Sequence, residues 1–193
     1  MKVAVIKYNA GNIRSVDYAL QRLGIQSHIT DNREEILAAD KVIFPGVGEA
    51  STAMCYLQDK GLDSLIKELK QPVLGICLGM QLLCSWSEEG NTNGLGIFDV
   101  KVKKFTGKEK VPHMGWNNIS KLSSTLFKAV PEKSFFYFVH SFYAEAGPDT
   151  IASADYINNF SASLHKDNFY GVQFHPEKSG TIGSKILENF LSI

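Results

Sequence analysis

A single cysteine stands where a nucleophile could be exposed and activated. Residues 73–76 (VLGI) form a short apolar run, Cys77 follows within the segment GICLG, and a helix-forming segment begins at Leu78. This pattern predicts a strand, a sharp turn and a helix, with the thiol at the turn. The helix amino end favours thiolate over thiol, and the flanking glycines permit a tight backbone. We predict that Cys77 attacks a carbonyl group; the alternative is a cysteine that only packs.

A base and its orienting group occur together near the end of the chain. Residues 170–174 (YGVQF) are typical of a strand, and the tripeptide HPE follows at residues 175–177. Side chains two apart in an extended segment point the same way. Glu177 can therefore reach one ring nitrogen of His175 while the other faces Cys77. The alternative is a surface His-Pro turn. Three other histidines are weaker candidates for the base: His28, His140 and His165.

A glycine-bearing loop gives a third signal. The segment FPGVG at residues 44–48 leads from a predicted strand into a loop, and a helix begins near Glu49. Such a loop can direct a backbone N–H towards an oxyanion, although Pro-Gly is also common in ordinary connections. Gly46 and Gly48 flank Val47, so a peptide group here could rotate. We predict that only one orientation offers its N–H to the oxyanion.

The elements that must position these residues alternate between strand and helix over the first two-fifths of the chain. Short links between them imply a parallel sheet covered on both faces. We predict strands at residues 3–8, 25–30, 41–44, 73–76, 97–105, 134–143, 162–164 and 170–174. We predict helices at residues 12–23, 33–39, 49–69 with a break near Gly61, from Leu78 through Cys84, and 180–190, with a loop at 90–94.

The fold class that follows is α/β. We expect one domain over residues 1–193, with a mostly parallel central sheet flanked by helices and antiparallel strands added in the C-terminal half. The length favours a single globular unit with a sizeable core. Cys84, two turns after Cys77 on the same predicted helix, is expected to face that core.

Composition excludes several classes of function. The net charge is +0 and 44% of the residues are hydrophobic, so charge indicates neither nucleic acid nor a membrane. No apolar run approaches the roughly 20 residues that cross a bilayer, and the first residues are typical of a strand rather than a signal peptide. Cys55, Cys77 and Cys84 lack zinc spacing and are odd in number. We therefore expect reduced thiols, a cytoplasmic location, and neither a metal nor a cofactor.

Taken in chain order, the segments PGVG, GICLGMQ and HPE resemble the class I, triad-type glutamine amidotransferases over essentially the whole chain. The resemblance implies glutamine as substrate and a γ-glutamyl thioester on Cys77. It implies that His175 is general base and then acid, and that Glu177 orients it. It implies an oxyanion hole formed by the backbone of Leu78 with that of Val47 or Gly48. It implies glutamine contacts at Gln81, Glu89, Ser141 and Phe142.

Three further segments resemble one subfamily, the glutaminase subunits of imidazole glycerol phosphate synthase. They are residues 8–16, 112–117 (PHMGWN) and 175–179 (HPEKS). This implies a heterodimer in histidine biosynthesis with a (β/α)8-barrel cyclase subunit, which uses the ammonia on a phosphoribosyl-formimino aminoimidazole carboxamide ribonucleotide to form imidazole glycerol phosphate and AICAR. It also implies weak glutaminase activity until the cyclase site is occupied.

The same resemblance implies a partner interface, at Gly11, Asn12, Trp116, Asn117, Tyr137 and Lys178. For Trp116 and Tyr137 the alternative is packing within a sheet, although both residue types are favoured anchors at interfaces. The chain departs from the subfamily at residues 7–9, where KYN replaces the common Asp-Tyr-Gly. No triad residue is affected.

Three other functions stay open on the sequence. A glutaminase subunit of a different synthase would be expected to lack the PHMGWN segment. A non-catalytic binding module on a related α/β fold would not react with a glutamine-analogue electrophile at Cys77. A cysteine hydrolase for another γ-glutamyl compound would be exposed by a panel of substrates.

Overall fold

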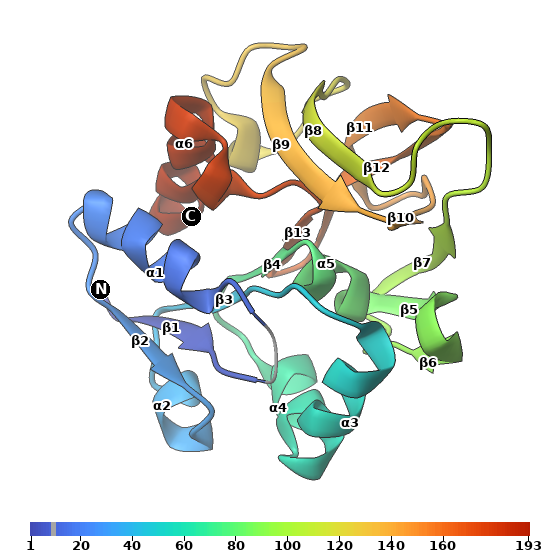
Figure 1. The fold of residues 1–193 in the computed structure, drawn as a ribbon. Helices are drawn as coiled ribbons and strands as arrows, with labels where there is room; N and C mark the ends of the chain where they lie inside the picture. Colours follow the sequence, from blue (N-terminus) through green and yellow to red (C-terminus); the bar gives the residue numbers. More distant parts are fainter. Residues whose placement is uncertain (9–10) are drawn as a thin grey trace.

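The computed structural model describes residues 1–8 and 11–193, and its centre is a seven-stranded sheet (Figure 1). The strand order is β11-β12-β13-β4-β3-β1-β2. The strands are β1 (Val3–Ile6), β2 (Ser27–Thr30), β3 (Lys41–Phe44), β4 (Val73–Ile76), β11 (Thr150–Tyr156), β12 (Asn158–Lys166) and β13 (Phe169–Val172). The strands from β13 to β2 are parallel, and β12 and β11 extend the sheet in antiparallel fashion.

Helices cover both faces of this sheet (Figure 1). One face carries α1 (Ile13–Arg22) and α6 (Gly180–Ser192). The other carries α2 (Arg33–Leu37), α3 (Ala50–Asp59), α4 (Leu62–Glu68) and α5 (Leu78–Leu83). None of the helices within the described part of the chain has the length and apolar character needed to span a membrane.

The sheet separates the apolar core into two clusters, one on each face, because successive side chains of a β-strand point to opposite faces. In β1, Ala4 and Ile6 pack with α2–α5, whereas Val3 and Val5 pack with α1 and α6. Every residue of β1, β3, β4 and β13 is buried. A parallel strand covered on both faces must be apolar on both, which explains why these strands appear in the sequence as short continuous apolar runs.

Two smaller sheets complete the fold. One has the order β10-β7-β5-β6 and the other pairs β8 with β9. Their strands are β5 (Cys84–Ser87), β6 (Thr92–Asn93), β7 (Phe98–Lys104), β8 (His113–Asn118), β9 (Phe135–His140) and β10 (Phe142–Ala144). The predicted fold class is confirmed, but β5, β6, β8 and β11 were not predicted. The sequence of β8, HMGWNN, lacks the β-branched residues and clean alternation that predict a strand.

Several predicted boundaries are wrong in the C-terminal half. The strand predicted at 134–143 is two strands, β9 and β10, which are separated at Ser141. The loop predicted at 90–94 contains part of a 3-10 turn, η1 (Glu89–Asn91), and the short strand β6. Two further 3-10 turns are η2 (Thr125–Phe127) and η3 (Pro176–Lys178). Strand β13 lies parallel to β4, so the parallel core includes a strand from the C-terminal half.

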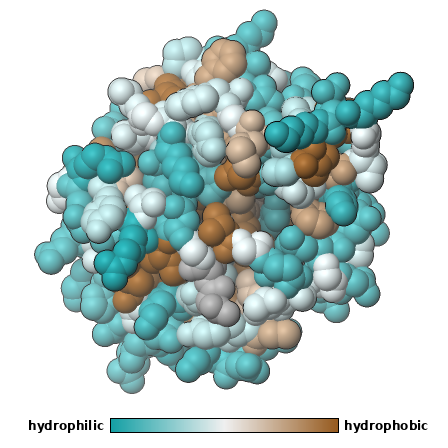
Figure 2. All heavy atoms as spheres, viewed as in Figure 1, coloured by the Kyte–Doolittle hydropathy of each residue, from teal (hydrophilic) through white to brown (hydrophobic). Residues whose placement is uncertain are grey.

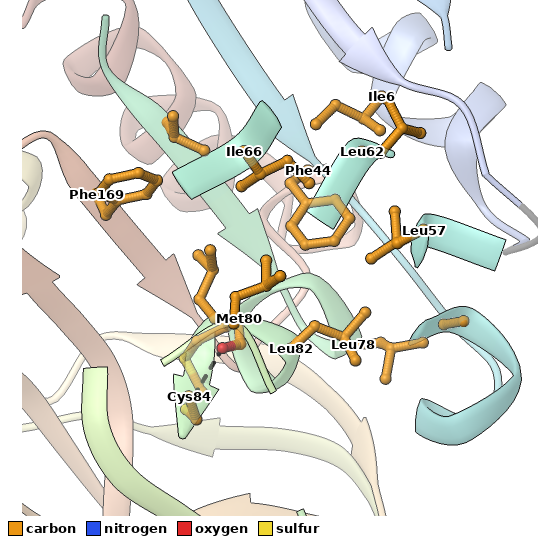
Figure 3. Packing of buried hydrophobic residues seen from close by; sticks show 14 of the residues in the cluster. Ile6, Phe44, Leu57, Leu62, Ile66, Leu78, Met80, Leu82, Cys84 and Phe169 are labelled. Carbon is orange, nitrogen blue, oxygen red and sulfur yellow. Dashed lines mark hydrogen bonds between the residues drawn. The ribbon is translucent and has the colours of Figure 1, made fainter. Parts of the chain in front are cut away.

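The helix after Cys77 is shorter than predicted. It ends at Leu83, and Cys84 has extended backbone angles and begins β5, because it pairs with β7 in the smaller sheet. The placement of Cys84 on that helix is therefore wrong, but its burial is confirmed. Its Sγ atom donates to the Met80 carbonyl oxygen at 3.5 Å, and Met80 packs in the same apolar cluster as Phe44 (Figure 3).

The strand order brings four carboxyl ends together. Strands β13, β4, β3 and β1 are consecutive neighbours in the sheet and run in the same direction. In open parallel sheets, ligands bind outside the carboxyl ends of the strands. Four of the segments singled out in the sequence each follow one of these strands: residues 11–12 follow β1, residues 45–48 follow β3, Cys77 follows β4 and His175 follows β13. The PHMGWN segment instead lies in and just before β8.

Candidate active site

Cys77 lies in a strained turn between β4 and α5. Its backbone angles, φ 52° and ψ −108°, are rare for a residue with a side chain. A Cβ atom at Gly79 would lie 1.8 Å from the Phe44 carbonyl oxygen, and one at Gly75 would lie 2.8 Å from Leu83 Cδ1. The GICLG pattern therefore reflects a turn in which the backbone on either side of the cysteine is too crowded for a side chain.

His175 and Glu177 form a buried hydrogen-bonded pair beyond β13. His175 Nδ1 lies 2.7 Å from Glu177 Oε1, and both side chains are shielded from solvent. The opposite ring atom, Nε2, is buried and has no hydrogen-bond partner of standard geometry among the described residues. Burial lowers the pKa of His175, but the charge and hydrogen bonding of Cys77, together with Glu177, outweigh it and raise this pKa. The imidazole thus lies between the thiol and the carboxylate.

Asn12 takes part in this arrangement in a way that sequence reasoning missed. Its side-chain Nδ2 donates to Glu177 Oε1, the oxygen that also binds His175. Asn12 precedes α1 and has a left-handed backbone with φ 69°, a conformation that asparagine tolerates better than most residues. The signal available in the sequence was a Gly-Asn pair just beyond the first strand.

A carbonyl group of the loop at residues 45–48 accepts a hydrogen bond from the backbone N–H next to the thiol. The Leu78 N–H donates to the Gly46 carbonyl oxygen at 3.3 Å, and the Gly11 N–H donates to the Val47 carbonyl oxygen at 3.3 Å. The C=O and N–H of a trans peptide point in opposite directions. The peptide between Gly46 and Val47 therefore presents its carbonyl to Leu78 and directs the Val47 N–H away.

Tyr8 packs under this loop. A Cβ atom at Gly46 would lie 1.8 Å from the Tyr8 hydroxyl oxygen, so a larger residue at this position would displace the Tyr8 ring. The hydroxyl is buried without a partner among the described residues, and burial followed by the charge of Cys77 raises the pKa of Tyr8. The departure at residues 7–9 therefore leaves an aromatic ring beside the site; residues 9 and 10 lie outside the described part of the chain.

A pocket of about 270 Å³ opens beside the thiol. The residues predicted as nucleophile, oxyanion donors and glutamine contacts all line it: Val47, Gly48, Cys77, Leu78, Gln81, Glu89, Ser141 and Phe142. The remaining lining residues are Pro112, Val139 and His140. None of them was predicted to line the pocket, although His140 was a weaker candidate for the base and Pro112 begins the PHMGWN segment. The structure therefore places three separately predicted groups of residues in one cavity of a size that suits an amino acid.

Gln81 links one wall of the pocket to the thiol. Its side-chain Nε2 donates to the Phe142 carbonyl oxygen and to Gln173 Oε1, each at 2.9 Å. Gln173, which is fully buried, donates from Nε2 to Cys77 Sγ at 3.5 Å. Gln173 was not predicted as a site residue; its position two residues before His175, on the same side of an extended segment, was the available signal.

Glu89 adds a carboxylate to the pocket. Its Oε2 atom accepts from the Ala50 N–H at 2.9 Å, which fixes the side chain near the start of α3. Burial raises the pKa of Glu89, and this effect outweighs that hydrogen bond. Among residues 1–8 and 11–193, no three His, Cys, Asp or Glu side chains gather as metal ligands would.

Four of the residues predicted as partner contacts lie on β8, β9 and η3: Trp116, Asn117, Tyr137 and Lys178. The other two, Gly11 and Asn12, lie between β1 and α1. Trp116 and Tyr137 are register partners of β8 and β9, with ring centroids 6.2 Å apart, and Trp116 is 55% exposed. Lys178 Nζ lies 6.0 Å from the centre of the Tyr137 ring. Figure 2 shows apolar residues gathered near the middle of this face, around the position of α5, within a largely hydrophilic surround.

The fold and this site match a known family. The model of the glutamine amidotransferase class-I family matches residues 4–193, so the chain belongs to that family. The expected resemblance to these enzymes is thereby confirmed.

Relatives place the chain more narrowly. It is 64% identical to "Imidazole glycerol phosphate synthase subunit HisH" of Bacteroides fragilis and 62% identical to the protein of that name from Bacteroides thetaiotaomicron, in both cases over 100% of either chain. Among solved structures it resembles a glutamine amidotransferase from Thermotoga maritima, with a TM-score of 0.69 at 17% identity, covering 100% of this chain and 83% of that one. The last likeness concerns the fold alone.

Proposed function

We propose that residues 1–193 act as one glutamine amidotransferase domain, the glutaminase subunit of an imidazole glycerol phosphate synthase. It hydrolyses glutamine to glutamate and ammonia and delivers the ammonia to a (β/α)8-barrel cyclase subunit in histidine biosynthesis. The observation that carries the proposal is the buried pairing of His175 with Glu177 beside the strained Cys77. The choice of synthase is supported by sequence identities of 64% and 62%, over the full length of both chains, to two proteins named as HisH subunits.

The chemistry needs a nucleophile, a proton carrier and an oxyanion site. The Cys77 thiolate attacks the γ-amide carbon, and the carbonyl oxygen takes up the negative charge. The His175 imidazolium then donates its Nε2 proton to the leaving nitrogen, so ammonia departs and a thioester remains. Water attacks the thioester while Nε2 takes its proton, which releases glutamate and restores the thiolate–imidazolium pair. Glu177 stays ionised and stabilises the imidazolium throughout.

The pocket residues supply the recognition that this chemistry requires. The Glu89 carboxylate is the anionic group that can pair with the α-ammonium of glutamine. Both N–H groups of the Gln81 amide are used within the protein, so its oxygen is the atom that can accept a bond from substrate. Ser141 and Phe142 contribute main-chain atoms beside them.

Control of the oxyanion site follows from the loop at residues 45–48. In the structure, the Leu78 N–H is occupied by the Gly46 carbonyl oxygen. Rotation of the peptide between Gly46 and Val47 frees the Leu78 N–H and brings the Val47 N–H towards the same place. We infer that occupancy of the cyclase shifts the population to this second orientation and so raises glutaminase activity. Gly48 is the other loop N–H that could complete the hole.

The cyclase subunit is proposed to dock over β8, β9 and η3. Exposed Trp116 and the pair formed by Tyr137 and Lys178 give this face aromatic anchors beside a cation. Gly11 lies at the same edge, where its N–H binds the loop after β3. Asn12 is a further proposed contact. Asn117 was also predicted as a contact, but its side chain points to the side of β8 opposite to Trp116 and donates to the Asp155 carbonyl oxygen. A cytoplasmic location accompanies this function.

The test is glutamate release from glutamine, measured for this protein alone, then with the cyclase subunit of the same organism, and then with the cyclase ribonucleotide added. Strong stimulation only in the third mixture is expected. Cys77→Ala run in parallel controls for contaminating glutaminase. Activity that does not respond to this cyclase would assign the protein to another synthase, and no glutaminase activity in any mixture would overturn the proposal.

A further inference from the structure

Two buried histidines lie beside the site without a part in the proposed chemistry. His113 in β8 and His140 in β9 are register partners, and both are buried. The His113 ring stacks on Tyr156 with centroids 4.0 Å apart. Burial lowers the pKa of His113 to about 4 and that of His140 to about 3. Both rings are therefore neutral near pH 7, and each has one N–H and one lone pair.

The surroundings determine which ring nitrogen carries the proton. His140 Nδ1 lies 2.7 Å from the Phe142 carbonyl oxygen, which can only accept, so Nδ1 bears the hydrogen. His140 Nε2 is then an acceptor, and His113 Nδ1 donates to it at 3.0 Å. His113 Nε2 is left to accept from the Asn117 side-chain amide at 3.4 Å. One set of tautomers satisfies every polar atom of both rings.

The hydrogen bonds continue from Phe142 to the thiol. The Phe142 carbonyl oxygen accepts from both His140 Nδ1 and Gln81 Nε2, which uses both of its lone pairs. Gln81 also donates to Gln173, and Gln173 donates to Cys77 Sγ. A shift of the Phe142 carbonyl therefore changes the bonds of Gln81 and, through Gln173, the environment of the sulfur.

The other end of this series lies on the inner side of β8. Met114 and Trp116 are exposed, whereas His113 and Asn117 alternate with them along the strand and point to the opposite face. Asn117 is held there because its Nδ2 also donates to the Asp155 carbonyl oxygen at 3.0 Å. A protein bound on the outer side of β8 would therefore act on the inner side through the same short strand.

We propose that His113 and His140 are positioning residues that hold the Phe142 carbonyl and connect β8 to the Cys77 site. This proposal rests on the proposed function, because it takes glutamine as the ligand of the pocket and the cyclase as the occupant of β8. The hydrogen bond from His140 to the Phe142 carbonyl supports glutamine binding, because it fixes the carbonyl to which Gln81 also donates. The hydrogen bond from His113 to His140 transmits a movement of β8, on which the partner is proposed to dock, to the Phe142 carbonyl.

The first test separates binding from chemistry in His140 variants. His140→Phe keeps a ring but removes both nitrogens, whereas His140→Asn places an amide nitrogen where Nδ1 lies. We expect His140→Phe to raise the KM for glutamine about tenfold, with a smaller change in kcat, because Gln81 loses a fixed partner. His140→Asn should recover most of this loss. Equal KM values for the parent protein and His140→Phe, or equal values for the two variants, would overturn the proposal.

The second test addresses the connection to β8. His113→Phe should reduce the stimulation by cyclase and ribonucleotide about tenfold while lowering the unstimulated rate much less. His113→Asn retains the donor to His140 and should restore stimulation. The matched control is His165→Phe, because His165 also stacks on a tyrosine, with its ring centroid 4.1 Å from that of Tyr170, but lies outside this series. If His113→Phe and His165→Phe lose the same amount of stimulation, His113 does not connect β8 to the site.

A measurement on the parent protein is independent of activity and of variant folding. Nitrogen chemical shifts of 15N-labelled histidine distinguish the two neutral tautomers and the charged ring. At pH 7 we expect His113 and His140 both to carry the proton on Nδ1 and to lack it on Nε2. Any other protonation state of either ring overturns the proposal. A parent protein that shows this state but releases no glutamate in any mixture would overturn the proposed function, and with it the roles in glutamine binding and in the response to the partner, but not the hydrogen-bonded histidine pair itself.

Discussion

Asn12 and Glu177 are separated by 165 positions in the chain, yet the Asn12 amide donates to Oε1 of the Glu177 carboxylate. That oxygen also binds His175 Nδ1 at 2.7 Å. Two donors on one oxygen hold the carboxylate from the side of β1 and from the side of β13. The position of the imidazole therefore depends on the segment after the first strand, as well as on the HPE tripeptide itself.

Removal of the Asn12 side chain should slow glutamine hydrolysis with or without a partner. Asn12→Gly suits the left-handed backbone at φ 69°, so it tests the side chain without adding strain. A hydrogen bond to a charged group contributes about 1.5–3 kcal/mol. If about 1.4 kcal/mol of this stabilisation is lost in the transition state, kcat falls about tenfold. Steady-state assays of glutamate release check this. A variant with a normal unstimulated rate and only weaker cyclase binding would show that Asn12 acts at the interface alone.

Neutralisation of the carboxylate should have a larger effect. Glu177→Gln removes the charge that helps to raise the pKa of His175, so this pKa should fall and the imidazolium should be less populated. We expect the rate to fall at least about a hundredfold, with acyl-enzyme formation still detectable by mass spectrometry. Glu188→Gln, an exposed residue paired with Lys185, is the control. An unchanged rate would remove Glu177 from the triad.

The thiol can be tested without disturbing the fold. Cys77→Ala should abolish glutamine hydrolysis and labelling by a glutamine-analogue electrophile, with little change in the free energy of unfolding, because a small buried group is lost. Cys55→Ala, at an exposed cysteine, should leave both intact. Activity of Cys77→Ala above about a tenth of that of the parent protein would exclude Cys77 as the nucleophile.

The proposed loop rotation depends on one N–H. Val47→Pro removes that donor, whereas Val47→Ala keeps it. We expect Val47→Pro to lose stimulation by cyclase and ribonucleotide about a hundredfold, the usual cost of one oxyanion donor, and Val47→Ala to retain it. Circular dichroism and cyclase binding establish that Val47→Pro is folded. Full stimulated activity in a folded Val47→Pro protein would show that the donor is another residue, Gly48 first.

The sequence predicts this molecule best where a constraint is local. Strands β3 and β4 match their predicted bounds because a strand buried on both faces is a short apolar run between turn residues. Cys77 and the HPE tripeptide were identified because the types of residue required by a strand–turn–helix and by an oriented imidazole lie next to each other in the chain.

Other parts of the site depend on contacts between distant segments, and the sequence did not predict them. The bond from Gln173 to Cys77 and the pairing of His113 with His140 exist only after β13 lies beside β4 and β8 lies beside β9. Strand β8 escaped prediction because its inner side carries polar residues that bind one another instead of apolar ones. A polar cluster of this kind resembles a loop until its partners are known.

The buried histidine pair should make the protein sensitive to mild acid. Burial lowers the pKa of His140 to about 3, whereas the pKa of an unfolded histidine is about 6.5. Between these two pH values the unfolded chain binds a proton that the folded protein does not. The free energy of unfolding should therefore fall as the pH is lowered, by about 1.4 kcal/mol from His140 between about pH 7.5 and 5.5. His175 acts in the opposite sense: its raised pKa contributes stability below about pH 6.5 that is lost at alkaline pH. Urea unfolding of the parent protein and of His140→Phe at the two pH values measures the difference, with His165→Phe as the control. If the parent protein and His140→Phe lose equal stability on acidification, His140 does not remain neutral in the folded protein.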